Sequence, residues 1–443
     1  MRDESLRLLK WFEQMTDWPI VTVEELAAKS KGALATGPFG SSIGSKTFRE
    51  SGVPVIRGGN LSQDIGKRLD DVGLVFVDEV LAKEFSRSVA VEGDLVFTCW
   101  GTINQVGLID ERASFPRYIV SNKQMKLTVD QDKALPLFLY YFFSSPLGQH
   151  QIEMNAIGSS VPGFNLSKLR SIPVPLPPLR VQKQIVALLG SLDDKIELNR
   201  RMNETLEAMA QVIFRDWFVD FGPTRRKLEG ATDPLTIMGG LVQDSERAQA
   251  LADLFPAALG DDGLPEGWTF GRLEDVLELA YGKALPKGER RDGTIPVYGS
   301  GGVGGFHDTA LVSGPSVIVG RKGTVGSLYW EDDDFYPIDT VFYVKSKLPM
   351  TYCYQLLQTL GLETMNTDAA VPGLNRNNAY RLEVPQPYNS KLLSEFGEIA
   401  DVLRSKITAN VRENRTLAAT RDLLLPKLMS GEVRLSAASE AVT

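Results

Sequence analysis

The sequence predicts an α+β protein in which two similar strand-rich lobes are each followed by one long helix. Three observations support this fold class. Several phrases of the first half recur in the same order in the second half, short apolar runs alternate with turn residues inside each half, and an apolar repeat of 3.5 residues follows a proline-rich stretch twice. Together they predict a pseudo-twofold molecule whose halves share one plan.

The clearest repeat is the phrase VPGFN at 161–165, which returns as VPGLN at 371–375. Trp18 followed by VEEL recurs as Trp268 followed by LEDV, and GDLVFTCWGT at 93–102 matches GPSVIVGRKGT at 314–324. Solenoid repeats are only some tens of residues long, so this spacing indicates a doubled domain.

The composition is that of an ordinary globular protein, with 443 residues, 43% hydrophobic and 23% charged. Only two cysteines occur, Cys99 and Cys353, far apart in the sequence, which argues against a disulfide framework and suits a reducing compartment. The first fifteen residues mix charges into every turn and resemble no secretion signal. We therefore expect a cytoplasmic protein without a membrane span.

The net charge of −8 is unusual for a nucleic-acid-binding protein, but attraction to phosphates depends on where charge lies rather than on its sum. Acidic residues gather in 229–266 and in the EDDD run at 331–334, whereas basic residues gather in loops of both lobes. The distribution therefore leaves a nucleic-acid partner open.

Each lobe is predicted to begin with short β-strands. The apolar runs VPVI, DLVFT and MKLTV in the first lobe, and IPVY, SVIVG and TVFYV in the second, are separated by Gly, Pro, Asn and Ser. Prolines end each lobe, in SIPVPLPP at 171–178 and VPQP at 384–387. A connector between the halves contains one short predicted helix, VQDSERAQALADLF.

A long helix follows each lobe. Its apolar positions are spaced alternately by four and three residues, as in a coiled-coil seam. The seams are Ile185, Leu189, Leu192, Ile196, Asn199, Asn203, Leu206, Ala210, Ile213 and Trp217, and Phe396, Ala400, Leu403, Ile407, Asn410, Asn414, Leu417, Arg421, Leu424 and Leu428. Pro426 is expected to end or kink the second helix early.

Both seams contain asparagines at matching places, Asn199 with Asn203 and Asn410 with Asn414. An asparagine inside a seam fixes the register, because its amide needs a partner that one alignment supplies. We therefore expect the two helices to pair, although the asparagines could instead lie at solvent-exposed edges. Parallel and antiparallel pairing would both bring the asparagines together, so the spacing does not choose between them.

Basic and polar side chains recur in glycine-rich loops of both lobes, including 37–49, 281–291, 320–324 and 375–378. Such loops let backbone N–H groups approach phosphates, and Arg, Asn and Ser side chains can read base edges. A solvated polar loop is the alternative for each stretch taken alone.

Several stretches look catalytic without meeting the requirements of catalysis. GSSIGSKT at 40–47 lacks the Gly-Lys of a phosphate-binding loop, and GSGGVG at 299–304 is expected to form a turn. Cys99 has no histidine partner that we can nominate, so a small apolar role is expected, and His307 beside Asp308 is expected to be an exposed loop pair. We find no adenine-methylation motif or nuclease cluster.

The whole organisation resembles the specificity subunit of Type I restriction-modification enzymes. The resemblance rests on two lobes closed by VPG-x-N, on the helix LLGSLDDKIELNRRMNETLEAMAQVIFRDWFVDFGP, on LPEGW at 264–268 and on LLLPKLMSGEV near the C-terminus, and it covers nearly the full chain. It implies target recognition domain 1 at 1–178, a central conserved helix at 179–222, an acidic connector at 223–264, target recognition domain 2 at 265–388, a C-terminal conserved helix at 389–430 and a tail at 431–443.

The resemblance implies a non-catalytic subunit. Each lobe would read one half of an asymmetric, bipartite sequence in double-stranded DNA, and an antiparallel helix pair would set the spacing between the halves. Two modification subunits, which bind S-adenosylmethionine and methylate adenine, would dock on the helices, and ATP- and Mg-dependent restriction subunits would join them. No cofactor or metal is expected in this chain. The alternative is a non-catalytic protein–protein adaptor with a coiled-coil spacer.

Candidate DNA-binding residues follow from loop position and chemistry, and all are polar or basic. They are Ser41, Ser42, Lys46, Arg57, Thr102, Asn104, Asn122, Lys123 and Asn165 in the first lobe, and Lys283, Lys287, Arg290, Arg291, Ser300, Arg321, Lys322, Asn375 and Arg376 in the second. For partner docking, the candidates are the exposed helix faces and the cluster of Trp217, Phe218 and Phe221, with core packing as the alternative for these aromatics.

Overall fold

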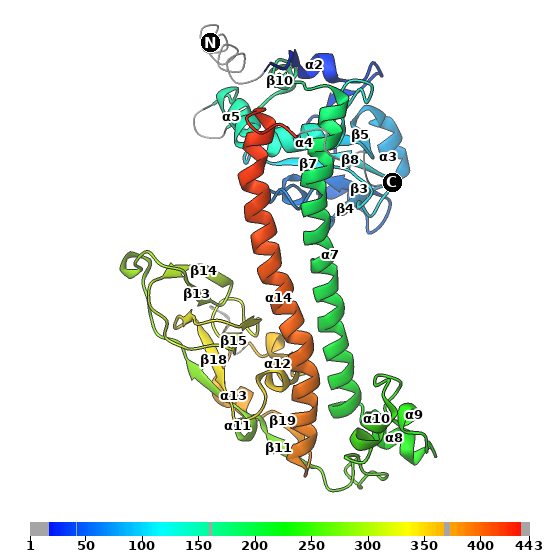
Figure 1. The fold of residues 1–443 in the computed structure, drawn as a ribbon, viewed down its shortest axis with the longest axis vertical. Helices are drawn as coiled ribbons and strands as arrows, with labels where there is room; N and C mark the ends of the chain where they lie inside the picture. Colours follow the sequence, from blue (N-terminus) through cyan, green and yellow to red (C-terminus); the bar gives the residue numbers. More distant parts are fainter. Residues whose placement is uncertain (1–16, 41, 159–161, 367–372, 436–443) are drawn as a thin grey trace. The chain divides into compact units, whose positions relative to one another are not determined.

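The computed structural model describes residues 17–40, 42–158, 162–366 and 373–435. It divides into two compact units, one of Met1–Leu198 with Glu413–Thr443 and the other of Asn199–Arg412. Each unit therefore contains one lobe and parts of both long helices (Figure 1). Below, lobe 1 denotes residues 17–178 and lobe 2 denotes residues 265–388.

Lobe 1 is built on two four-stranded sheets, with the strand orders β2-β9-β6-β7 and β4-β3-β8-β5. The strands are β2 Leu34–Thr36, β3 Val53–Ile56, β4 Val75–Val77, β5 Val89–Val91, β6 Asp94–Thr98, β7 Val106–Leu108, β8 Arg117–Val120 and β9 Gln124–Thr128. β3 and β6 are buried along their whole length, which explains why VPVI and DLVFT are continuous rather than alternating apolar runs.

The two ends of lobe 1 meet, because β1 Ile20–Thr22 pairs antiparallel with β10 Pro173–Pro175. Short helices lie between the strands: α2 Val23–Leu26, α3 Glu79–Glu84, α4 Pro136–Ser144, α5 Pro146–Met154 and α6 Leu166–Arg170, with 3-10 turns η1 Ser45–Thr47, η2 Gly58–Asn60 and η3 Ser86–Ser88. The aromatic run of α4 is buried against the strands, and Phe97 of β6 meets Phe143 edge to face.

Lobe 2 repeats this plan with the sheets β12-β18-β15-β16 and β14-β13-β17 and the terminal pair β11-β19. Its strands are β11 Thr269–Arg272, β12 Glu278–Tyr281, β13 Ile295–Gly299, β14 Gly302–His307, β15 Ser316–Gly320, β16 Leu328–Glu331, β17 Tyr336–Pro337, β18 Val341–Lys345 and β19 Glu383–Gln386. Its helices are α11 Leu273–Val276, α12 Met350–Thr359 and α13 Arg376–Tyr380, with 3-10 turns η4 Lys287–Glu289 and η5 Leu362–Thr364.

The two lobes share most of their strand pairings. The sheet β2-β9-β6-β7 corresponds to β12-β18-β15-β16, and β4-β3-β8 corresponds to β14-β13-β17, whereas β5 has no counterpart among the described strands of lobe 2. In lobe 1 the pair β3–β8 is parallel within an otherwise antiparallel sheet, and in lobe 2 the pair β13–β17 is parallel in the same place. Both lobes also close by pairing their first and last strands. The predicted α+β fold with a duplicated domain is therefore confirmed.

The long helices are α7 Leu179–Phe218 and α14 Ser390–Met429 (Figure 1). In the first unit, Asp193 pairs with Arg421 and the amide of Asn414 donates to the Ile196 carbonyl. In the second unit, the amide of Asn410 donates to Asn203 at 2.8 Å, and Arg404 lies 3.8 Å from Glu207. Residue numbers rise along one helix as they fall along the other, so the pairing is antiparallel in each unit.

The seam asparagines are not at a solvent-exposed edge. Asn199 is 0% exposed, Asn410 is 1% exposed, and the other two asparagines are half-buried. The alternative of exposed edge positions is therefore wrong. A buried amide contributes most when its partner fixes the alignment, and Asn203 is such a partner for Asn410.

The expectation that Pro426 ends the second helix early is wrong, because α14 continues to Met429. A proline in the last turn removes only one of the helix's hydrogen bonds. Leu425, Leu428 and Met429 on either side of it are buried in the core of the first unit, and this burial offsets the cost.

A buried charge network joins lobe 1 to the helices in the first unit. Asp193 of α7 accepts from Tyr141 at 2.6 Å and from Arg421 at 2.9 Å, and Arg68 lies 3.9 Å from it while also pairing with Asp110. Burial opposes the charge of Arg421, but hydrogen bonds to Asp193 and Asp422 raise its pKa above the usual value. The network therefore keeps its charges paired in the interior.

In the second unit the connector packs against the end of α7. It contains α8 Gly222–Leu228, α9 Pro234–Ile237 and α10 Ser245–Ala252, the last of which confirms the predicted short helix. Arg226 binds both carboxylate oxygens of Asp216, at 2.9 and 2.8 Å.

The aromatic cluster at the end of α7 lies in the core of the second unit. Trp217, Phe218 and Phe221 pack against residues of the connector and lobe 2, such as Phe255 and Trp268. Their prediction as a partner-docking surface is wrong, because side chains with almost no exposed area cannot contact a partner. The alternative of core packing holds.

Candidate nucleic-acid interface

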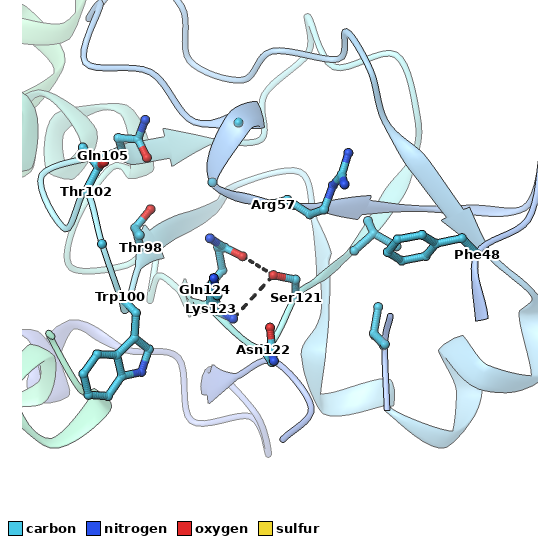
Figure 2. A pocket seen from close by; sticks show the side chains of 15 residues that line it. Phe48, Arg57, Thr98, Trp100, Thr102, Gln105, Ser121, Asn122, Lys123 and Gln124 are labelled. Atoms are coloured by element: carbon cyan, nitrogen blue, oxygen red, sulfur yellow. Dashed lines mark hydrogen bonds between the residues drawn. The ribbon is translucent and has the colours of Figure 1, made fainter. Parts of the chain in front are cut away.

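Lobe 1 contains a pocket of about 590 Å³ where three segments end side by side. These are the end of β3 with Arg57, the end of β6 with Thr98 and Trp100, and the turn from Ser121 to Gln124 between β8 and β9. Figure 2 shows Ser121 and Gln124 in the middle of the view, with Arg57 and Phe48 on one side and Thr98, Thr102 and Gln105 on the other. The pocket therefore lies at the ends of buried strands.

Four predicted DNA-binding residues line this pocket: Arg57, Thr102, Asn122 and Lys123. Arg57 donates to the Gly73 carbonyl at 3.0 Å and lies over the Phe48 ring at 5.8 Å, and the amide of Asn122 donates to the Gly40 carbonyl at 2.8 Å. Of the described residues that line the pocket, none is Asp or Glu. The pocket therefore combines two cations with uncharged donors and acceptors, a composition suited to DNA.

The floor of the pocket contains two buried polar atoms that lack a protein partner. Thr98 is 2% exposed and Gln124 is 0% exposed, and neither Thr98 Oγ1 nor Gln124 Nε2 has a hydrogen-bond partner among the described residues. The other end of the Gln124 amide is fixed, because its Oε1 accepts from Ser121. Buried polar groups are normally paired, so each orphaned atom calls for an explanation.

The remaining predicted residues of lobe 1 have local partners or lie apart from the pocket. Ser41 lies outside the described residues. Ser42 donates to the Phe39 carbonyl, Lys46 is exposed, and Asn104 donates to Glu153 at 2.7 Å. Asn165 caps α6 by accepting from the backbone N–H of Lys168, so it fixes the corner where the repeated phrase ends.

In lobe 2, two predicted arginines stack on one exposed aromatic ring. The guanidinium of Arg321 lies 5.0 Å from the Tyr281 ring centroid, and that of Arg376 lies 4.6 Å from the same centroid. Arg321 also donates to the Asp339 carbonyl at 2.8 Å. Stacking orients each guanidinium while leaving N–H groups for phosphates or base edges.

The other predicted residues of lobe 2 surround this pair or lie on neighbouring loops. Lys283, Lys287 and Lys322 are exposed. Arg290 donates to the Gly304 carbonyl at 2.7 Å, Arg291 is bound to Asp308 at 2.7 Å, and the Ser300 carbonyl accepts from Ser327 and Tyr329. Asn375 caps α13, as Asn165 caps α6.

The sequence reasoning missed five residues that the structure brings into these places: Thr98, Trp100, Gln105, Gln124 and Tyr281. Trp100 stood in the repeated stretch 93–102 and Tyr281 in the basic loop 281–291. An aromatic ring inside such a basic loop is a signal that could have identified Tyr281. Gln124 directly precedes the predicted strand MKLTV and gave no local signal.

The catalytic look-alikes are structural. Burial raises the pKa of the Cys99 thiol to about 12, which keeps it protonated and unreactive. GSGGVG forms the turn between β13 and β14, as expected. The expectation of an exposed loop pair is wrong for His307, which is 5% exposed and accepts from the backbone N–H of Arg291. Only its neighbour Asp308 is exposed.

In the described ranges, no helix is long and apolar enough to span a membrane. In the same ranges, no three His, Cys, Asp or Glu side chains gather as a group that could hold a metal ion.

Comparison with known proteins gives relatives of one kind. A specificity subunit of the Type I restriction enzyme HindI from Haemophilus influenzae is 25% identical over 381 residues, which cover 71% of this chain and 81% of the relative. The Type I restriction enzyme MjaIX specificity subunit from Methanocaldococcus jannaschii is 24% identical over 391 residues, covering 81% and 82%.

A solved structure shares the fold. The S subunit of a Type I restriction-modification system from M. genitalium has a TM-score of 0.53 to this chain at 18% identity, covering 93% of this chain and 96% of that one. The family model for the Type I restriction modification DNA specificity domain matches residues 15–208 and 265–388. Because these two stretches make up most of the sequence, this chain belongs to the Type I restriction modification DNA specificity domain family.

Proposed function

We propose that this chain is the DNA-specificity subunit of a Type I restriction-modification enzyme and that it recognises an asymmetric, bipartite target in double-stranded DNA. The observation that supports the proposal is the pair of lobes with closely similar topology and different polar faces. Each lobe reads one half of the target. Because the faces differ, the two half-sites differ in sequence.

The division of contacts follows from the chemistry of each face. Exposed lysines such as Lys287 and Lys322 bind phosphates and give salt-dependent affinity that is insensitive to sequence. Oriented groups such as Arg321 and Arg376 read base edges. The capping asparagines Asn165 and Asn375 hold the loops in place, and their amide N–H groups remain candidates for DNA contact.

The long antiparallel helices act as the spacer between the half-sites. The length of the helices and their seam asparagines support this role. Because the asparagines fix the register, the helix pair has one constant length. Two recognition elements at a fixed separation require half-sites separated by a fixed number of base pairs.

The chain itself performs no catalysis in this proposal. Two modification subunits bind S-adenosylmethionine and methylate an adenine in each half-site, and restriction subunits that use ATP and Mg join the complex. The modification subunits dock on exposed helix faces, where Met209, Val212 and Val402 offer apolar side chains.

The proposal is tested by mapping methylated adenines across the genome of cells with and without this chain. We expect methylation at one two-part sequence only when the chain is present. A labelled duplex with that sequence should be bound, and inserting several base pairs between the halves should abolish specific binding. Methylation that does not depend on the chain, or tolerance of the insertion, would contradict the proposal.

The adaptor alternative makes a different prediction. A protein–protein adaptor keeps its partners in DNase-treated extract and never retards a labelled duplex. A specificity subunit retards its own target duplex in a gel. The affinity should fall as salt is raised and should fall again when the target sequence is changed.

A further inference from the structure

The pocket of lobe 1 is an open concavity whose volume falls in the range of small-molecule sites. Its volume of about 590 Å³ is comparable to pockets that bury a small ligand. An intact duplex presents a convex backbone and base edges recessed in grooves, so it cannot enter a concavity of this size. A single nucleotide taken out of the base stack can enter it.

The floor offers an unused donor and a hydroxyl in fixed positions. Thr98 and Gln124 are cross-strand partners on β6 and β9, so the ladder fixes their backbones and places both side chains on the same face of the sheet. Thr98 Oγ1 and Gln124 Nε2 are buried and have no partner among the described residues. Such groups favour an occupant that supplies the missing acceptors.

Gln105 supplies an acceptor on the same lining. The amide of Gln105 donates to the Leu61 carbonyl at 2.8 Å, which leaves its Oε1 as the end toward the pocket. A Cβ placed on Gly58 would lie 3.7 Å from Gln124 Nε2 and 3.9 Å from Gln105 Oε1. Both atoms therefore face the space next to Gly58, and nucleobases carry donors and acceptors at their edges that can bind such groups.

The rim suits the rest of a nucleotide. Arg57 and Lys123 are exposed cations of the lining and can pair with a phosphate. Trp100 is 52% exposed, and its ring lies so close to Gly163 that a Cβ there would be 2.5 Å from it. An indole braced in this way is a platform for stacking a base.

We infer that this pocket holds one unstacked nucleobase, recognised by Gln124, Gln105 and Thr98, with the adjoining phosphate at Arg57 and Lys123. The inference rests on the proposed function and deepens it, because it names residues that make lobe 1 specific. The same chemistry is offered by a base extruded from the target duplex and by a free nucleotide, and the experiment separates the two sources.

Two adjacent glycines provide matched variants. Gly58→Ala places a methyl group next to Gln124 Nε2 and Gln105 Oε1 at ordinary contact distance, without strain, because Gly58 has no positive φ. Gly59→Ala adds the same methyl group in a position where no described atom lies within 4 Å. Both variants should fold. Both glycines line the pocket, but only the methyl group at Gly58 would lie against Gln124 and Gln105, so only the first variant should block access to these two side chains.

The DNA arm uses the full chain with its modification subunits and the target duplex found by methylation mapping. 2-Aminopurine replaces one base at a time in the half-site read by lobe 1, and its fluorescence reports unstacking. We expect one position to brighten with the wild type and with Gly59→Ala but not with Gly58→Ala. The affinity of Gly58→Ala for the target should fall about 5- to 100-fold, while non-specific binding is kept.

In the nucleotide arm, dAMP, dGMP, dCMP and dTMP are each titrated into the full chain without DNA, and binding is measured by calorimetry. A free nucleotide is the occupant if Gly58→Ala abolishes nucleotide binding, Gly59→Ala keeps it, and the two variants give the same 2-aminopurine fluorescence. No difference between the variants in either arm overturns the inference. Failure of the proposed function is distinct, because the wild-type chain would then show no specific binding of the duplex at all.

Discussion

The two lobes share the strand order of their larger common sheet but carry different side chains at equivalent positions. In lobe 1 the ladder pairs Thr98 with Gln124, and in lobe 2 the same place is occupied by Gly320 and Val341. Trp100 bridges to Gly163 in lobe 1, and Lys322 bridges to Gly373 in lobe 2. The backbone plan is therefore maintained by hydrogen bonds that any residue can make, while the side chains at the strand ends are free to differ.

The lobes also differ in how each contacts the helices of its own unit. Lobe 1 uses the buried network around Asp193. Lobe 2 uses the EDDD run, where Asp332 accepts from Thr408 at 2.8 Å and Asp333 pairs with Arg412 at 2.9 Å. Asp333 and Arg412 are largely exposed, so the second attachment is screened by solvent more than the first.

The largest expected effect is the loss of Asp193. Asp193→Ala leaves Arg68 and Arg421 buried without their shared carboxylate, and it should lower the free energy of unfolding by about 3–5 kcal/mol. Denaturant unfolding measures this change. The control Lys195→Ala, which breaks an exposed pair with Glu413, should cost about 1 kcal/mol or less. Equal costs for the two variants would contradict the comparison between the attachments.

Asp332→Ala makes the corresponding break in lobe 2. Trp330 and Thr408 lose an acceptor but can bind water, since this carboxylate is partly exposed. We expect a loss of about 1–2 kcal/mol in the same unfolding experiment. A loss as large as that of Asp193→Ala would show that both attachments depend on buried charge.

The arginines on Tyr281 should determine how lobe 2 reads its half-site. Arg376→Ala and Arg321→Ala should each weaken binding by about 1–3 kcal/mol per lost base contact and relax the sequence preference of that half-site only. Binding selections on randomised half-sites measure the preference. Unchanged affinity and preference at every salt concentration would remove the arginine concerned from the interface.

An exposed lysine should have a smaller and different effect. Lys287→Ala should weaken binding to all sequences alike and reduce the slope of log affinity against log salt by about 1. Titrations at several salt concentrations give the slope. A change in sequence preference without a change in slope would place Lys287 at a base instead of a phosphate.

The buried thiols should be unreactive in the folded chain. Burial raises the pKa of Cys353 to about 11 and that of Cys99 to about 12, so the thiolate is scarce at neutral pH in both lobes. A thiol reagent should label neither cysteine until denaturant is added. Rapid labelling of Cys99 alone would mean that the strand ends of lobe 1 open more readily than those of lobe 2.

The sequence was sufficient for features that depend on periodicity. The long helices and their pairing follow from the spacing of the seam, because a buried seam must recur every 3.5 residues. The duplicated lobes follow from phrases that recur in the same order in both halves. The seam even included Arg421, whose partner Asp193 follows Leu192 on the other helix. The antiparallel direction required contacts between residues far apart in the chain.

The site was less predictable because it depends on which strands become neighbours. Arg57, Thr102, Asn122 and Lys123 were found from loop chemistry, but Gln124 became part of the floor only through its pairing with β6. Trp217 illustrates the converse error. An aromatic side chain at the end of a helix looks the same in sequence whether a connector covers it or leaves it exposed.

The pairing of β1 with β10, and of β11 with β19, places the beginning and the end of each lobe next to each other. The chain therefore enters and leaves each lobe at the same place, through two adjacent strands. Recombination between related genes at the two ends of a lobe can therefore replace the whole lobe while the helices and their seam stay intact. New target sequences can then arise by exchange of whole modules, with no need for gradual change in the spacer.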